Sequence, residues 1–230
     1  MELNDEVFTL LALVVPLGIA AAITPTLIAM QLLVVAGGTH WQRRSLAVIA
    51  ANAIAFGIVI ALVTFGFAQL PDAGTGGGGT LDAVIRIAAG GVLALASIWF
   101  FVPHPEMAER VRTSLEARMS HASIWVFFAL AFYFSITDLS SYLVLLPALH
   151  DITASSIAVG EKAVVLAVVL FLALQATILP PLVRLVAGER VVPSLNRIYR
   201  WVMLNQFPIV GAVCAAVGVF LLVTGMVRLG

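Results

Sequence analysis

One stretch of the chain gathers side chains that could handle a charge or a proton inside an apolar environment. The segment FSITDLSSY places Asp138 among the hydroxyl groups of Thr137, Ser140, Ser141 and Tyr142. A carboxylate at the centre of a bilayer costs roughly 2.5–3.5 kcal/mol on insertion scales, so it needs a partner, a proton or water. We interpret this segment as a broken helix that lines a cavity. The alternative is a protonated acid whose hydrogen bonds only stabilise packing.

A second stretch, in the first apolar segment, contains Thr24, Pro25 and Thr26. Proline lacks a backbone N–H and clashes with the preceding helical turn, so a kink or break is predicted there. The segment ITPTLIAMQLL, residues 23–33, aligns with ITDLSSYLVLL, residues 136–146, and Pro25 then corresponds to Asp138. The two stretches are therefore predicted to occupy equivalent positions in an internal repeat.

Other polar side chains lie within the apolar segments: Gln31, Asn52, Thr64, Gln175 and Thr177. They could face the same cavity as Asp138. Hydrogen bonding between neighbouring helices is the commoner use of such residues in membranes. Gln31, Asn52 and Gln175 are kept as candidate site residues on the first interpretation.

The composition indicates that these residues are positioned by membrane helices. Hydrophobic residues make up 62% of the chain and charged residues 10%, against about half and about a quarter in soluble domains; the mean hydropathy is +1.10. A bilayer crossing takes about 20 apolar residues, which must be helical to satisfy their backbone. Six segments are long enough: residues 7–36, 45–70, 81–102, 123–149, 163–186 and 208–227.

The basic residues predict the orientation, because Lys and Arg near the ends of spans stay in the cytoplasm. They gather in the first, third and fifth loops: Arg43, Arg44, Arg110, Arg112, Arg118, Arg184, Arg190, Arg197 and Arg200. The protein is therefore expected to be a multi-pass protein of the cell membrane with both termini outside. Residues 106–119 and 194–204 have the spacing of interfacial amphipathic helices, with solvated connecting helices as the alternative.

The predicted organisation is two halves joined by a cytoplasmic loop: residues 1–102, the loop 103–122, and residues 123–230. Each half has three spans, so the second half must be inverted relative to the first. The predicted fold class is therefore an all-α integral membrane protein with six transmembrane helices in two inverted three-helix repeats, the first and fourth helices being broken. Secondary transporters often use this plan, with substrate bound near the midplane between the repeats.

Several function classes are not indicated. The formal net charge is zero, so a nucleic-acid partner is not expected. The single cysteine, Cys214, and four histidines without metal-ligand spacing give no reason to expect a metal or cofactor: His40, His104, His121 and His150. One intramembrane acid without a matched base is a poor catalytic set, so we do not expect an enzyme.

The layout resembles the LysE exporter superfamily, and within it the peptidoglycolipid-addressing (GAP) or sulfolipid-addressing family. The resemblance rests on the proline-containing first span with its short basic turn at residues 37–44, and on three segments: SITDLSSYLVLLPALHDI, ILPPLVRLVAGERVVPSLNRI and PIVGAVCAAVGVFLLVTGMVRL. It implies a six-span protein that exports or addresses cell-envelope glycolipids. Metal-exporting relatives carry acid-rich motifs in both halves, whereas Asp138 has Pro25 as its counterpart, which argues against a divalent-cation route.

Three functions are compatible with these observations. The first is export or flipping of a lipid or amphipathic solute at a midplane site lined by Thr24, Pro25, Thr26, Asp138, Ser140 and Ser141. The second is proton-coupled export of a small amino acid or cation, with Asp138 carrying the proton. The third is a non-transporting scaffold of a lipid-export complex. Membrane lipids are the expected partners, and a homodimer is a further option.

Overall fold

The computed structural model describes residues 2–37, 40–68, 78–101 and 123–228, and this part of the chain is helical throughout apart from short connections. Residues 103–122, including the predicted interfacial helix at 106–119, lie outside the described part. The helices are α1 (Glu2–Ala21), α2 (Pro25–Ala36), α3 (Trp41–Ala68), α4 (Gly78–Phe101), α6 (Ile124–Ile136), α7 (Leu139–Ala154), α8 (Val159–Ala173), α9 (Gln175–Ala187), the 3₁₀ turn η1 (Gly188–Val191) and α10 (Val192–Val227).

The described helices have the length and composition of membrane spans. Three stretches qualify alone, Trp41–Phe67, Asp82–Phe101 and Gln175–Val227, and the bent pairs α1–α2 and α6–α7 bring the number to five. The all-helical membrane class predicted from composition is therefore confirmed. The sixth crossing stays a prediction, because α8 has only 15 residues and the chain from Gln175 to Val227 counts as one stretch of 53 residues.

Two helix breaks occur where the sequence predicts them. The axis turns by 63° between α1 and α2, and by 59° between α6 and α7. Pro25 begins α2, where a missing N–H costs no helical hydrogen bond. Asp138 is the N-cap of α7, and its side chain accepts from the backbone N–H of Ser141.

Two further interruptions were not predicted. α8 and α9 are separated at Leu174, and α10 is kinked at Asn205, where φ is −112° and ψ is 15°. Pro208 follows the kink and has no N–H for the carbonyl of Leu204. The predicted interfacial helix at 194–204 is the first part of α10, and it buries one face within the protein: Leu195, Tyr199, Val202 and Met203.

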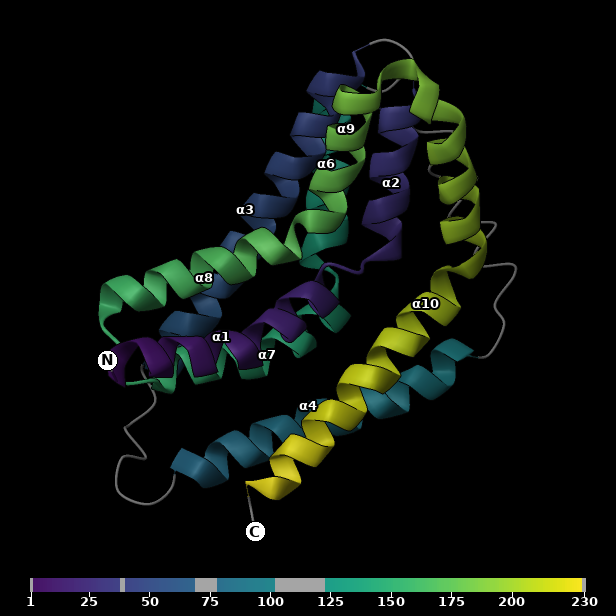
Figure 1. Cartoon of the computed structure of the whole chain (residues 1–230). Coiled ribbons are helices and arrows are strands. Elements are labelled where there is room, and N and C mark those ends of the chain that lie inside the picture. The colour runs from purple at the N-terminus through teal and green to yellow at the C-terminus, as the bar shows by residue number, and fades with distance from the viewer. Residues whose placement is uncertain (1, 38–39, 69–77, 102–122, 229–230) are drawn as a thin grey trace.

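The helices form three groups (Figure 1). α2, α3, α6 and α9 lie against one another, and α1, α7 and α8 form a second group on the other side of the breaks. α4 runs alongside the C-terminal part of α10. The two backbones come close together at Gly90 and Gly218, because a Cβ built on Gly90 would lie 2.8 Å from the carbonyl oxygen of Gly218.

Candidate functional site

The breaks in α1–α2 and α6–α7 meet at the carboxylate of Asp138. Thr24 donates to Asp138 Oδ2 at 2.6 Å, and Ser140 donates to Oδ1 at 2.6 Å. Ser141 Oγ lies 2.6 Å from Oδ2, 2.9 Å from the carbonyl oxygen of Ala21 and 3.2 Å from Thr24 Oγ1. We call Thr24, Asp138, Ser140 and Ser141 the carboxylate cluster. Its hydrogen bonds provide partners for backbone and side-chain polar groups that the two helix breaks leave unpaired.

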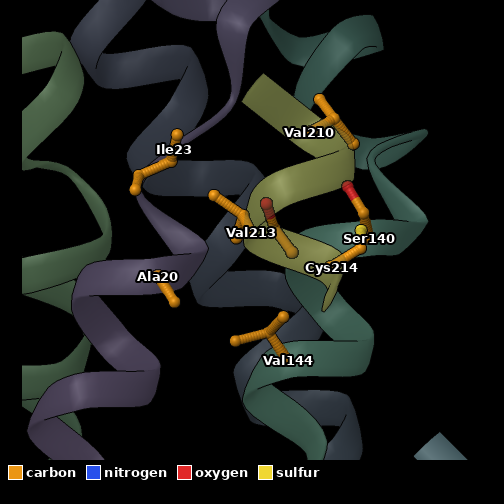
Figure 2. Close-up of a pocket in the computed structure, with 8 residues that line it drawn as sticks. Ala20, Ile23, Ser140, Val144, Val210, Val213 and Cys214 are labelled. Atoms are coloured by element: carbon orange, nitrogen blue, oxygen red, sulfur yellow. The ribbon is translucent and has the colours of Figure 1, made fainter. Parts of the chain in front are cut away.

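A recess lies beside the carboxylate cluster, between α1, α7 and α10 (Figure 2). It is lined by Ala20, Ile23, Ser140, Ser141, Val144, Val210, Val213 and Cys214. Its cavity volume is about 10 Å³, far below the roughly 300–1,000 Å³ of typical small-molecule pockets. In this conformation the recess is too small to hold a lipid headgroup.

A second polar network links three helices through Asn52 on α3. Ser135 Oγ donates to Asn52 Oδ1 at 2.8 Å, and Asn52 Nδ2 donates to Thr177 Oγ1 at 3.3 Å. Gln31 donates to Ser45 Oγ at 2.6 Å and to the carbonyl oxygen of Thr177 at 2.8 Å. Gln31 and Asn52 therefore connect helices near the breaks, and among the described contacts neither has a hydrogen bond to Asp138.

The other predicted site residues have separate positions. Tyr142 donates to the carbonyl oxygen of Ser135, and Thr137 donates to that of Tyr133 in the preceding helix α6. Gln175, at the start of α9, donates across the break at Leu174 to the carbonyl oxygen of Phe171 in α8. Pro25 is buried at the start of α2, and among the described contacts Thr26 has no hydrogen bond to Asp138. The candidate set is thus divided into the carboxylate cluster, the Asn52 network and residues that only stabilise single breaks or helices.

A buried ion cluster joins α4, α7 and the end of α10. The guanidinium of Arg86 binds Asp82 at 3.1 Å and also pairs with Asp151. Arg228 pairs with Asp82 and lies 3.6 Å from Asp151, and His150 Nδ1 lies 3.4 Å from Asp82 Oδ1. Asp82, Arg86, His150 and Asp151 are all at least nine-tenths buried. We call these four residues together with Arg228 the ion cluster.

The ion cluster was not predicted from the sequence. The predicted fourth span ends at residue 149 and leaves His150 just beyond it, whereas α7 continues to Ala154 and buries both His150 and Asp151. A usable signal was the spacing of Asp82 and Arg86, four residues apart in an apolar segment. Charged groups there need buried partners.

Asp82, His150 and Asp151 offer ligand atoms that lie within 4.8 Å of one another. Both carboxylates, however, are already paired with arginine side chains. A metal cation would be repelled by Arg86 and Arg228 or would have to displace them. The residues present therefore fit an ion-pair network better than a metal site.

A further buried cation lies at the far end of the α9 helix. Arg184 donates to the carbonyl oxygens of Val35 and Gly37, the second at 2.7 Å, and pairs with Glu189 at 2.6 Å. Its guanidinium also stacks over the ring of Trp41 at 4.6 Å. The side chain thus binds the free carbonyl groups at the C-terminal end of α2.

Apolar helices interrupted around a half-buried carboxylate define an all-helical membrane protein with a polar site within its spans. The chain belongs to the family described as "Sap, sulfolipid-1-addressing protein", whose family model matches residues 14–227. The resemblance to the sulfolipid-addressing family is therefore confirmed. Searches of curated proteins and of solved structures found no match.

Proposed function

We propose that this protein moves a cell-envelope lipid or an amphipathic solute across the cell membrane, with the carboxylate cluster at its substrate site. The observation that carries the proposal is the hydrogen bond from Thr24 to Asp138, which joins two helix breaks at a polar centre. Non-helical backbone and an acid are tolerated at membrane depth where they line a cavity. The family description, which refers to sulfolipid addressing, supports a lipid as the substrate class.

Six crossings with both termini outside are part of the proposal. Contacts divide the helix ends into two sets, as alternating crossings require. The first set is proposed to lie outside. In it, Glu6 near the start of α1 contacts Ser156 between α7 and α8, and the ion cluster connects the start of α4 with the ends of α7 and α10. The second set is proposed to lie in the cytoplasm. In it, Arg184 near the end of α9 contacts the end of α2 and the start of α3, and Arg44 at the start of α3 stacks over Phe127 of α6.

Inverted repeats are supported by the positions of the breaks. Residues 22–24 separate α1 from α2, and residues 137–138 separate α6 from α7. In the alignment of residues 23–33 with 136–146, the two breaks overlap at Thr24 and Thr137. The third helix of each proposed half, α4 and α10, pack against each other. The repeat boundaries are those proposed from sequence, 1–102 and 123–230.

The direct test is lipid movement by the purified full-length protein in liposomes that contain a fluorescent lipid. We expect movement by the wild type and at least about tenfold slower movement by Asp138→Asn, because the variant cannot carry the charge or accept the same hydrogen bonds. Thr137→Val is the matched control, since the described hydrogen bonds of that hydroxyl go to carbonyl groups of the preceding helix α6. An inactive but folded wild type would instead favour the scaffold alternative, and an active Asp138→Asn would overturn the assigned site.

A specific observation also favours proton coupling as the second candidate. With Asp138 ionised, Thr24 and Ser141 both donate to Oδ2. With Oδ2 protonated, the carboxyl can donate to Ser141, whose own hydrogen then turns to the carbonyl of Ala21. Rotation of the Ser141 hydroxyl therefore gives the carboxyl a hydrogen-bond partner in both states.

Proton coupling can be tested by recording the internal pH of proteoliposomes while amino acids, cations or lipids are supplied. Proton movement that depends on one solute and is lost in Asp138→Asn would support this candidate. Lipid movement that is independent of the pH gradient would exclude coupling and leave the lipid proposal intact.

A further inference from the structure

α4 and the part of α10 after Asn205 form one packing unit. Gly218 lies so close to α4 that its Cβ would be 2.9 Å from the backbone nitrogen of Ala94. Gly225 likewise has no room for a Cβ, which would lie 2.8 Å from Ile87. Small residues allow this close backbone approach between membrane helices. We call α4 and residues 206–227 the α4–α10 arm.

The arm has a defined bending point at one end. Asn205 departs from helical geometry, and its side chain donates to the carbonyl oxygen of Trp201 at 2.8 Å. Pro208 removes the hydrogen bond that would otherwise close the next turn onto Leu204. Before this point α10 packs on α2; beyond it α10 packs on α4 (Figure 1). A rotation at Asn205 would carry the arm without disturbing the earlier part of α10.

The other end of the arm is fastened to α7 by the ion cluster. Three of its contacts cross from the arm to α7: Arg86 to Asp151, Asp82 to His150 at 3.4 Å, and Arg228 to Asp151 at 3.6 Å. The remaining pairs, Asp82 with Arg86 and Asp82 with Arg228, lie within the arm and the residue that follows it. Asp151 is therefore the acid on the α7 side, and removing its charge would loosen the attachment while leaving the arm's own ion pairs in place.

The recess lies in the seam that this attachment closes. α7 contributes Ser140, Ser141 and Val144 to its lining, and the arm contributes Val210, Val213 and Cys214 (Figure 2). We infer that the ion cluster is a latch: when the contacts to Asp151 break, the α4–α10 arm pivots at Asn205 and opens the recess between α7 and α10. This inference rests on the proposed function, in which the recess must widen to admit its substrate.

The charges can hold the arm closed until an external partner takes the place of one of them. Two carboxylates face two guanidinium groups, so the closed cluster is balanced and each charge is paired. Arg228, with 37% of its side chain exposed, is the member that water or an anionic group can reach first. Breaking one member leaves an uncompensated buried charge, which makes the open state costly without an external partner.

Cys214 provides a reporter for this opening. It is the chain's single cysteine, it lines the recess, and it is 1% exposed in the closed conformation. We would measure the rate at which N-ethylmaleimide labels the purified full-length protein in lipid nanodiscs. Asp151→Asn should label about tenfold faster than wild type, within the range of known coupling energies between sites. Asp151→Glu, which retains the charge, should remain closer to wild type.

Two matched controls separate latch opening from general loosening. Thr224→Val removes a hydroxyl contact of Arg86 within the arm, and Glu6→Gln alters the contact to Ser156, away from the seam. Both should label at the wild-type rate. Equal acceleration in these variants, or a wild-type rate in a folded Asp151→Asn protein, would overturn the inference.

A second variant acts at the bending point and keeps the test decisive if Asp151→Asn does not fold. Pro208→Ala restores the missing N–H and should stiffen α10, so Cys214 should label more slowly than in wild type. An unchanged rate in Pro208→Ala would contradict a pivot at Asn205. Because labelling reports opening and not transport, a failure here is distinguishable from a failure to move lipid.

Discussion

Thr24 and Asp138 lie 114 residues apart in the sequence, and the Thr24 hydroxyl donates to the Asp138 carboxylate at 2.6 Å. Because Thr24 is the N-cap of α2 and Asp138 the N-cap of α7, this contact ties the beginnings of these two helices together. Ser141 adds a bond to the carbonyl of Ala21, so each break supplies a partner for polar groups exposed by the other. The two bent helices therefore stabilise one another's interruptions.

Replacing Thr24 with valine should weaken this connection. Hydrogen bonds between membrane helices contribute about 0.6 kcal/mol on average and about 1.7 kcal/mol at most. We expect Thr24→Val to lower the thermal stability of the detergent-purified protein by an amount in that range. Thr26→Val is the control, and an equal loss in both variants would show that the Asp138 contact is not responsible.

Replacing Asn52 with leucine should cost more than replacing Gln175 with leucine. Asn52 is buried and accepts from Ser135, whose hydroxyl would lose its described partner. A buried polar group without a partner costs about 1–3 kcal/mol. Among the described contacts, Gln175 bonds only to the carbonyl of Phe171, across the short break between α8 and α9. Thermal unfolding of both variants checks the order, and a larger loss for Gln175→Leu would contradict it.

The adjacent glycines Gly90 and Gly91 should respond differently to alanine. A Cβ at position 90 would lie 2.8 Å from the carbonyl of Gly218, whereas a Cβ at position 91 meets nothing within 4 Å. Overpacking typically costs about 1–3 kcal/mol. We expect Gly90→Ala to be destabilised, while Gly91→Ala is unchanged or gains up to about 1 kcal/mol from helix propensity. Comparing their midpoints of thermal aggregation tests this difference.

Arg184→Lys should destabilise the protein although the charge is retained. A single ammonium cannot reproduce the contacts of the guanidinium with Gly37, Glu189 and the ring of Trp41. The loss of one charge-assisted hydrogen bond is worth about 1.5–3 kcal/mol. Arg190→Lys, at an exposed position of the same connection, should have little effect. Limited proteolysis near residues 187–192 would detect the expected loosening.

The sequence predicted the helical membrane class and two of the breaks because the signals are local. Pro25 and Asp138 each disturb a helix through their own backbone or side chain, and the run of hydroxyl residues after Asp138 strengthens the signal. The interruption at Leu174 carries no such marker, since the nearest prolines, Pro180 and Pro181, lie within α9. Packing of Thr177 against Asn52 and Gln31 accompanies that break, and packing is not visible in a single sequence.

The site could be predicted only in part for the same reason. Ser140 and Ser141 are near Asp138 in the chain, and Thr24 came from the internal alignment. The ion cluster depends on three helix ends meeting in space. Arg86 and Asp151 are 65 residues apart, and neither lies in a sequence motif that predicts a contact with the other. From the sequence, Arg184 served only to predict the orientation in the membrane. The structure buries it among carbonyl groups, which gives it a structural role.

The middle helices of the two proposed repeats differ, because one is continuous and the other is interrupted. α3 continues through 28 residues without interruption, whereas its counterpart is divided at Leu174 into α8 and α9. Inverted-repeat transporters can change access by moving one repeat against the other. Here the middle helix of the first repeat is continuous and that of the second is interrupted, so the two repeats cannot adopt each other's conformation. In the proposed transport cycle, the inward-facing and outward-facing forms would therefore not be related by a pseudo-two-fold axis between the repeats.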